Sequence, residues 1–350
     1  MNENMRMNLP TGRQQARTRW QTHESGAIFD RKKTSYLTEQ AQTFIAQQSI
    51  CVVAGLGPQE ELCGLLLTGN SGFVQAPDGF TCSVQLKHQS STSRLIQGLH
   101  QYATNGEGVP LGLFFICHPT RERLCVQGMA HLQTLSHSSI SSPVTQICLD
   151  IRESFFHCAK YIKTKVAGLT SPIPPTLSLG WHPQNLLGYN QQCLSTEIQA
   201  FIEQQVLCFL CTRGKDGQCA INHRGGVPKF LVTQPPTPEF PGGRILLPDY
   251  AGNGAFEAIG NILETGQAAL VIPNYAAQLA ILVSGTAQVV ELEELPREVG
   301  QRCPGAERVV ILNIQHVETQ HGDWSDAIAY ERARAESSWA NGSLSHSCPL

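Results

Sequence analysis

The feature that most constrains the fold of this chain is an internal repeat. The segments "FIAQQSICVVAG" (44–55) and "FIEQQVLCFLCT" (201–212) share Phe, Ile, a Gln-Gln pair and Cys at a constant offset of 157 residues. The similarity continues more loosely, in a common order of helix, three strands, helix and two strands. A repeat this long indicates duplicated domains rather than a solenoid, whose units are ~20–50 residues long. The chain of 350 residues is long enough for two domains, each with its own core.

Each repeat unit is predicted to be mainly β, of the α+β class. Apolar runs rich in β-branched residues alternate with short Gly, Pro and Asn turns, and predict about six strands per unit. One internal helix is expected in each unit, at "TSRLIQGLHQYA" (92–103) and at "NGAFEAIGNILETG" (253–266). Strands in this number often close into a barrel, because closure removes exposed sheet edges.

Composition marks the boundaries of the two units. The Pro- and Gly-rich stretch that ends near residue 189 has no hydrophobic period and is typical of an extended linker. The expected organisation is an N-terminal tail (1–35), a first domain (36–165), a linker (166–189), a second domain (190–320) and a C-terminal tail (321–350). The N-terminal tail is polar and is expected to be disordered, whereas the C-terminal tail is expected to be helical to about Trp339.

Charge and hydropathy exclude several classes of partner. The net charge is −3 and the chain has no long basic run, so it is not expected to bind nucleic acid. It has no run of about 18 apolar residues, so no membrane span is expected. The N-terminus lacks the apolar core of a signal peptide. These features favour a cytoplasmic protein.

The 13 cysteines are predicted to be mostly buried thiols in a reducing compartment. They are odd in number and lie mainly inside apolar runs. Cys208 and Cys211 form a CxxC pair, but the pair lies in a probable strand, where positions i and i+3 point to opposite faces. A zinc knuckle places such a pair in a tight turn, so no metal site is expected.

The stretch "HRGGVPKFL" (223–231) is the first candidate binding site. Arg224 offers a guanidinium fork that matches an anion such as phosphate, and Lys229 adds a second charge. Gly225 and Gly226 lack a Cβ, so their backbone N–H groups are open to close approach. The residues alone leave two interpretations open: a loop that binds an anion, or a hairpin turn with solvated charges.

Two further segments supply candidate residues. In "PDYAGNGAFEAIGN" (248–261), Asn253 is placed to cap the following helix, whose N-terminus attracts anions. Asn261 lies two turns further on and either reaches a ligand or faces solvent. In "HCAKYIKTK" (157–165), the basic residues around Lys160 form either a binding segment or a solvated terminus.

The ordered set of these motifs resembles the FMN-binding split-barrel family of pyridoxamine 5′-phosphate oxidase-like proteins, in its two-domain subgroup. The resemblance runs roughly from Thr22 to Gln320. The second half carries it in "HRGGVPKFL", "LLPDYAGNGAFEAIGNILETGQAALVI" and "LAILVSGTAQVV", and the first half in "THESGAIFDRK", "LLLTGNSGFVQAPD" and "ESFFHCAKYIKTK". Val227 and Lys229 replace a Pro and a Gly of the subgroup's loop. The matching loop of the first half, "GNSGFV", lacks an equivalent of Arg224.

The resemblance implies tandem FMN-binding split β-barrels, with FMN as the cofactor at an interface formed inside the chain or in a homodimer. It implies that the loop of Arg224, Gly225, Gly226 and Lys229 and the turn of Asn253 bind the flavin phosphate. Asn261 is implied at the polar edge of the flavin, and Lys160 and Tyr161 close the site from the first domain.

The implied activity is that of an oxidoreductase acting on a small substrate, with electrons from NAD(P)H or from the substrate itself. No catalytic residue is predicted, because a flavin carries the hydride step and the protein binds and orients it. Two alternatives stay open: a non-catalytic flavin- or haem-binding module, and a degenerate duplicated barrel that serves as a structural or interaction protein.

Overall fold

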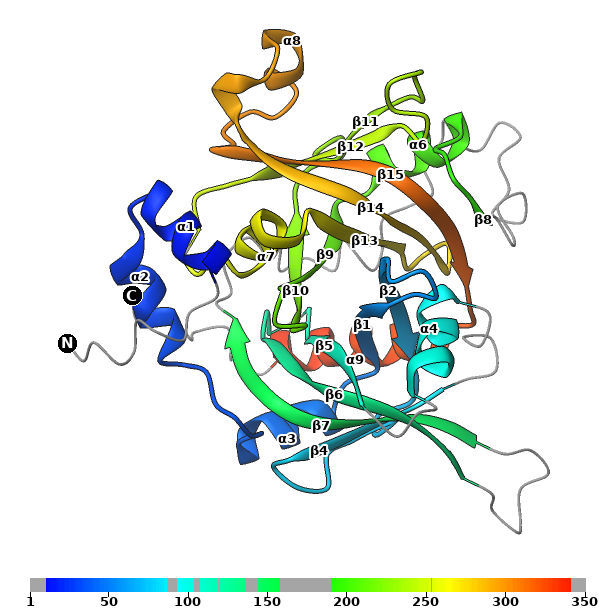
Figure 1. The fold of residues 1–350 in the computed structure, drawn as a ribbon. Coiled ribbons are helices and arrows are strands. Elements are labelled where there is room, and N and C mark those ends of the chain that lie inside the picture. Colours follow the sequence, from blue (N-terminus) through cyan, green and yellow to red (C-terminus); the bar gives the residue numbers. More distant parts are fainter. Residues whose placement is uncertain are drawn as a thin grey trace.

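The strands of the computed structural model form two antiparallel sheets, one from each half of the chain (Figure 1). The structure describes residues 11–86, 93–103, 108–118, 120–135, 144–157, 190–252 and 254–340. The expected linker and the last ten residues lie outside these ranges. No helix in the described ranges is both long and apolar enough to cross a membrane.

The first half supplies the lower sheet in Figure 1. Its elements are α3 (Glu39–Ala46), β1 (Ile50–Leu56), β2 (Leu62–Thr68), β3 (Val74–Gln75), β4 (Thr81–Gln85), α4 (Arg94–Ala103), β5 (Val109–Ile116), β6 (Arg123–Leu135) and β7 (Val144–His157). Its strand order is β2-β1-β5-β6-β7-β4-β3.

The second half supplies the upper sheet. Its elements are β8 (Asn190–Gln191), α6 (Thr196–Gln204), β9 (Leu207–Arg213), β10 (Cys219–Gly225), β11 (Val232–Gln234), β12 (Arg244–Asp249), α7 (Glu257–Thr265), β13 (Gln267–Asn274), β14 (Leu279–Glu291), η5 (Leu292–Glu294), α8 (Arg297–Gly300) and β15 (Arg308–His321). Its strand order is β10-β9-β13-β14-β15-β12-β11, with β8 added beside β15.

The two halves have the same connectivity, so the predicted tandem split-barrel fold is confirmed. The order of the first sheet becomes that of the second when each strand is replaced by its counterpart in the repeat. Even an irregularity repeats: each long hairpin carries a β-bulge, at Gly128 in β6 and at Gly285 in β14, 157 residues apart. A Cβ at either glycine would overlap a carbonyl oxygen of the facing strand. Each half also has a long last strand, β7 or β15, that the expected order of elements omitted.

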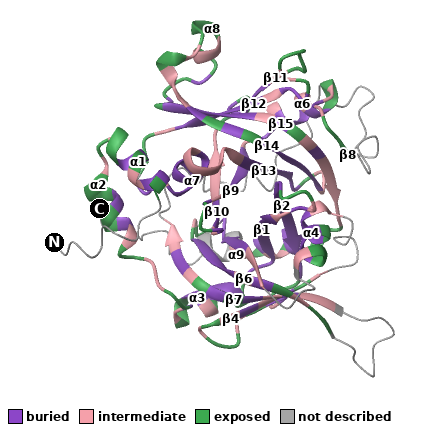
Figure 2. Ribbon diagram, viewed as in Figure 1, coloured by how far each residue is buried: buried purple, intermediate pink, exposed green. Residues whose placement is uncertain are grey.

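The two barrels share one apolar core. A single cluster of buried side chains includes residues of β1, β2 and β5 together with residues of β9, β10 and β13. The rings of Phe114 and Phe209 meet across the junction, with centroids 5.7 Å apart. Gly64 lies against Val271, so closely that a Cβ would overlap its side chain. Figure 2 shows the buried strands concentrated where the sheets face each other.

The cysteines lie as expected wherever the structure describes them. Eleven cysteines in the described ranges are free thiols, and most are buried. Cys208 packs in the core of the second barrel, whereas Cys211 packs in the cluster shared by both barrels. The CxxC pair therefore points to opposite faces of its strand, as predicted.

The expectation of a disordered N-terminal tail is wrong for residues 11–35. Helices α1 (Thr11–Arg19) and α2 (His23–Asp30) form there, and Arg17 pairs with Asp30 at 2.6 Å. Helix α1 packs on α7 of the second barrel, where Gly12 and Gly260 allow close approach because neither has a Cβ. Sequence polarity missed this contact because Gly12 and Gly260 are 248 residues apart in the chain.

The C-terminal tail is helical, as expected, and packs on the first barrel. Helix α9 spans Ser325–Ala340. Ser49 donates a hydrogen bond to the carbonyl oxygen of Ala327 (3.3 Å), and Arg334 donates one to that of Gln47 (3.0 Å). Each tail thus packs against the barrel at the opposite end of the chain.

Lys229 offers a test of the backbone geometry. It is exposed and has a left-handed φ of 71°. Such a conformation costs a non-glycine residue about 1–2 kcal/mol, and the extra chain entropy of glycine offsets part of the gain on substitution. We expect Lys229→Gly to raise the free energy of unfolding by ~1 kcal/mol, measured by urea denaturation.

The matched control is Lys215→Gly. Lys215 is an exposed turn residue whose φ is not positive. Only the entropy effect applies there, so the free energy of unfolding should fall by about 0.4–1 kcal/mol. Shifts of the same sign in both variants would contradict the assignment of strain to Lys229.

Candidate functional site

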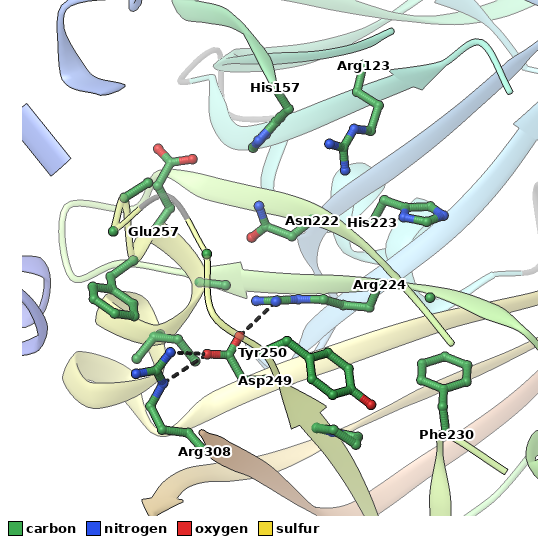
Figure 3. A pocket seen from close by; sticks show the side chains of 18 residues that line it. Arg123, His157, Asn222, His223, Arg224, Phe230, Asp249, Tyr250, Glu257 and Arg308 are labelled. Atoms are coloured by element: carbon green, nitrogen blue, oxygen red, sulfur yellow. Dashed lines mark hydrogen bonds and ion pairs between the residues drawn. The ribbon is translucent and has the colours of Figure 1, made fainter. Parts of the chain in front are cut away.

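A cavity of about 140 Å³ lies at the junction of the two barrels (Figure 3). The first half contributes Arg123, at the start of β6, and His157, at the end of β7. The second half contributes residues of β10, the end of β12, the loop that follows it, the first turn of α7 and the start of β15. The site therefore needs both halves of the chain.

A buried carboxylate organises the cationic side of the cavity. Asp249 accepts a hydrogen bond from Arg308 at 2.9 Å, and its other oxygen lies 2.7 Å from Nη1 of Arg224. Figure 3 shows the two guanidinium groups approaching it from different directions. Arg308 is also held by the rings of Trp20 and Phe256, 4.6 and 4.9 Å from its guanidinium carbon. Arg308 also pairs with Glu307 at 2.8 Å, so Asp249 is shared between Arg224 and an arginine that has a second carboxylate partner.

Arg224 keeps donors for a ligand. Its side chain is 24% exposed, and the contact with Asp249 uses Nη1. Its Nε has no hydrogen-bond partner among the described residues. Because a guanidinium group has five N–H donors, Arg224 can bind Asp249 and an anion together.

The N-terminal segment sets the charge at the opposite wall. Glu257, the buried first residue of α7, lies 2.5 Å from Nζ of Lys33 and 3.7 Å from Nη1 of Arg13. Lys33 also pairs with Glu153 of β7 at 2.9 Å. Burial acts to raise the pKa of Glu257, but Lys33, Arg13 and His157 outweigh it, so the pKa lies below its usual value. Glu257 is therefore ionised at neutral pH.

The two histidines of the cavity are neutral at pH 7. Desolvation lowers the pKa of His157 to about 3, aided by Arg123 and opposed by Glu257. Desolvation also holds the pKa of His223 well below its usual value, with Arg123 adding to the shift. His157 Nε2 lies 3.2 Å from Sγ of Cys125. Neither ring adds positive charge to the cavity.

Two residues of the predicted anion loop line the cavity and two do not. Arg224 and Gly225 are part of the lining. Gly226 donates its N–H to the carbonyl oxygen of Val206 at 2.9 Å, and Phe230 packs where its Cβ would be. Lys229 is exposed and is not among the lining residues.

Asn261 has a packing contact in place of a cavity position. It is buried, and its amide donates a hydrogen bond to Thr212 Oγ1 at 3.2 Å, which ties α7 to β9. Helix α7 begins at Glu257, with Phe256 and not Asn253 at its N-cap position. The remaining predicted site residues, Asn253, Lys160 and Tyr161, lie outside the described residues.

Sequence reasoning missed most of the charged lining. Asp249 lies in the motif "PDYAGN", but nothing in its neighbourhood shows that it pairs with Arg308, 59 residues away. That pairing follows from the register of β12 and β15, in which these two residues face each other. Arg123 and His157 likewise meet only through the pairing of β6 with β7.

The low pKa of His157 predicts a pH dependence of stability. Its folded pKa is about 3, whereas an unfolded histidine titrates near 6.5. Between these values the unfolded chain binds more protons, so this contribution to stability is lost as the pH falls below 6.5, by about 1.4 kcal/mol per pH unit. Glu318, whose pKa burial raises to about 7, acts in the opposite direction. The quantity to measure is therefore the difference between wild type and variant.

We expect His157→Gln to reduce the loss of unfolding free energy between pH 7 and pH 5 by about 2 kcal/mol, measured by urea denaturation. His100→Gln, at an exposed position in α4, is the control and should leave the loss unchanged. An equal pH dependence of wild type and His157→Gln would show that His157 is not held neutral by the fold.

The second half of the chain is similar to a known protein family. Residues 194–321 match the family model described as pyridoxamine 5′-phosphate oxidase. A putative pyridoxamine 5′-phosphate oxidase from Lactobacillus delbrueckii is 23% identical, with 37% of this chain and 97% of that chain covered and a TM-score of 0.30. Group A Streptococcus HupZ is 16% identical, with coverage of 37% and 95% and a TM-score of 0.28. The haem storage protein HutZ from Vibrio cholerae is 14% identical, with coverage of 35% and 89% and a TM-score of 0.22.

No curated protein matches the chain significantly. The resemblance expected from the motifs is confirmed by the family match, and the two sheets with one connectivity are consistent with a two-domain arrangement. The match to the pyridoxamine 5′-phosphate oxidase family covers residues 194–321, which form the second barrel.

Proposed function

We propose that this protein binds FMN in the junction cavity. The observation that carries the proposal is the contrast between the two edge strands. Strand β10 presents Asn222, His223 and Arg224 to the cavity. The equivalent positions of β2, 157 residues earlier, are Leu65, Leu66 and Leu67, all of them buried. Polar side chains on β10 and leucines at the equivalent positions of β2 are the pattern expected if only the β10 side binds a ligand.

The ion pair of Asp249 and Arg308 shows the same contrast. Asp249 and Arg308 face each other in the ladder of β12 and β15. The equivalent place in the first barrel is taken by Leu86 and Thr145, joined by a backbone hydrogen bond of 2.9 Å. Charged side chains are costly to bury unless they have a function or partners. Their presence in only the second barrel supports a single anion-binding site.

The cavity residues fit the parts of FMN. A phosphate dianion favours a guanidinium fork, and Arg224 retains donors beyond its contact with Asp249. Asn222 Oδ1 and His223 Nδ1 are buried without a hydrogen-bond partner among the described residues. Such atoms are costly unless a ligand or water satisfies them. The polar edge of a flavin offers both donors and acceptors.

The reaction class we propose is oxidation or reduction of a small substrate, with electrons from NAD(P)H or from the substrate. Bound FMN would supply the hydride transfer. The protein's part is to bind the phosphate through Arg224, to exclude water with the apolar junction, and to hold the ring between the barrels. His157 and His223 are neutral at pH 7, so each can share a hydrogen bond with a ligand there.

One observation favours a second candidate, a haem-binding module. His157 and His223 both line the cavity, and His223 Nδ1 has no hydrogen-bond partner among the described residues. A neutral imidazole nitrogen is a common ligand of haem iron. The absorbance spectrum of the purified protein distinguishes the two candidates, because flavin and haem absorb at different wavelengths.

The first test is the identity of the ligand. We expect the purified protein to be yellow and to release FMN, detected by mass spectrometry, in a ratio of one per chain. Apoprotein should regain the flavin absorbance band on addition of FMN. A haem spectrum would favour the second candidate. A colourless protein that binds neither ligand would favour the interpretation as a structural or interaction protein.

The second test concerns Arg224. A hydrogen bond to a charged group contributes roughly 1.5–3 kcal/mol. We therefore expect Arg224→Ala to weaken FMN binding by about ten- to a hundredfold, measured by quenching of flavin fluorescence. Gly225→Val should also weaken binding, because its side chain blocks approach to the backbone.

Thr68→Ala is the matched control, since Thr68 occupies the position equivalent to Gly225 in the first barrel. It should leave the affinity nearly unchanged. If folded Arg224→Ala binds FMN as tightly as wild type, the phosphate does not lie at this arginine.

A further inference from the structure

His157 and Gln320 occupy equivalent positions in the two barrels. His157 faces Arg123 in the ladder of β6 and β7, and Gln320 faces Ala280 in the ladder of β14 and β15. Arg123 and Ala280 are 157 residues apart, as the repeat requires. The last strand of each barrel thus brings one of these side chains to the edge strand of the other barrel.

Gln320 closes the equivalent site in the first barrel. Its Oε1 accepts a hydrogen bond from the N–H of Leu66 at 3.1 Å, and its Nε2 donates to the carbonyl oxygen of the same residue. A primary amide can make this pair because it carries a donor and an acceptor side by side. The outward backbone groups of edge strand β2 are therefore satisfied within the protein.

His223 is the counterpart of Leu66 in β10. Leu66 faces Val52 in the first sheet, and His223 faces Phe209 in the second. Successive residues of an antiparallel edge strand alternate between pairing with the neighbouring strand and facing outward. The N–H of Gly226 donates to Val206, which continues the pairing of β10 with β9 at even-numbered residues. The backbone N–H and C=O of His223 therefore face the junction.

The neighbouring odd-numbered residue supports this orientation. The carbonyl oxygen of Ile221 accepts a hydrogen bond from Sγ of Cys125 in the first barrel, at 3.3 Å. At the cavity itself, His157 stands in the place of Gln320, but its ring lies against Cys125 Sγ. An imidazole cannot present an adjacent donor and acceptor to one peptide group as an amide does.

We propose that the backbone N–H and C=O of His223 bind the imide edge of the flavin, its ring N–H and adjacent C=O. This inference rests on the proposed FMN site and adds the orientation of the ring to it. Gln320 then takes the place of the flavin in the other barrel. Its side-chain amide makes with the backbone of Leu66 the same two hydrogen bonds that the flavin makes with the backbone of His223. The site selects a ring with adjacent N–H and C=O, and the chain binds one such ring, because the second edge is already occupied.

The first experiment compares ligands on the wild-type protein. FMN methylated at the imide nitrogen lacks the donor, and we expect it to bind about ten- to a hundredfold more weakly than FMN. FMN chlorinated on the benzenoid ring keeps the imide edge and should bind within a few-fold of FMN. Equal affinity of FMN and the methylated analogue would overturn the ring orientation and leave the FMN site intact. Absence of binding by all three would overturn both.

The second experiment introduces the same side-chain amide at the cavity. His157→Gln places at the cavity the amide that Gln320 provides in the other barrel, so it should compete with the flavin for His223. His157→Leu is the matched control, because leucine has a similar size and no amide. We expect His157→Gln to bind FMN at least tenfold more weakly than His157→Leu, with both variants folded.

Two outcomes of this comparison count against the inference. Equal affinities of the two variants would show that an amide at position 157 does not reach the edge recognised by FMN. Tighter binding by His157→Gln than by His157→Leu would show that the amide contacts the flavin directly. In either case retained binding by wild type would leave the proposed function standing.

Discussion

The packing of the two sheets against one shared apolar core is the constraint on which the rest of this structure depends. Strands β2 and β10 are sheet edges, and an exposed edge invites pairing with other chains. Here each edge faces the other barrel, so the duplication covers both edges inside one chain. The cavity is a consequence, because it lies where the edge strand β10 meets the end of the β6–β7 hairpin.

The repeat makes two equivalent corners in the shared core, one where β10 meets the first barrel and one where β2 meets the second barrel. The two corners differ in their side chains. One corner keeps Arg224, Asp249 and His223, and the other has leucine at all three equivalent positions. A leucine-filled corner contributes burial of apolar surface without the cost of desolvating charge. The corner with charges gives up part of that stabilisation, which is the pattern expected of a site retained for binding. The duplicated fold thus has one apolar corner and one corner that contains charged and polar side chains.

The sequence was sufficient to predict the fold and part of the cavity lining. The repeat and its strand pattern predicted two barrels of one connectivity, because apolar alternation is a local property of the chain. Arg224 and Gly225, which line the cavity, were predicted together because they lie in one short motif. Asp249 and Arg308 were not found as a pair, since their contact depends on the register between β12 and β15. The N-terminal helices were missed for the same reason: their polar sequence folds only against α7.

Contacts of the N-terminal segment keep Glu257 in place at the cavity. Glu257 is buried at the start of α7, and an isolated buried carboxylate would be strongly destabilising. Its partners Lys33 and Arg13 come from the N-terminal segment, which also reaches Glu153 of the first barrel through Lys33. Ion pairs between three separate segments hold the two barrels at a fixed spacing beside His157. The N-terminal segment, which was expected to be disordered, therefore pairs with Glu257 of the cavity wall.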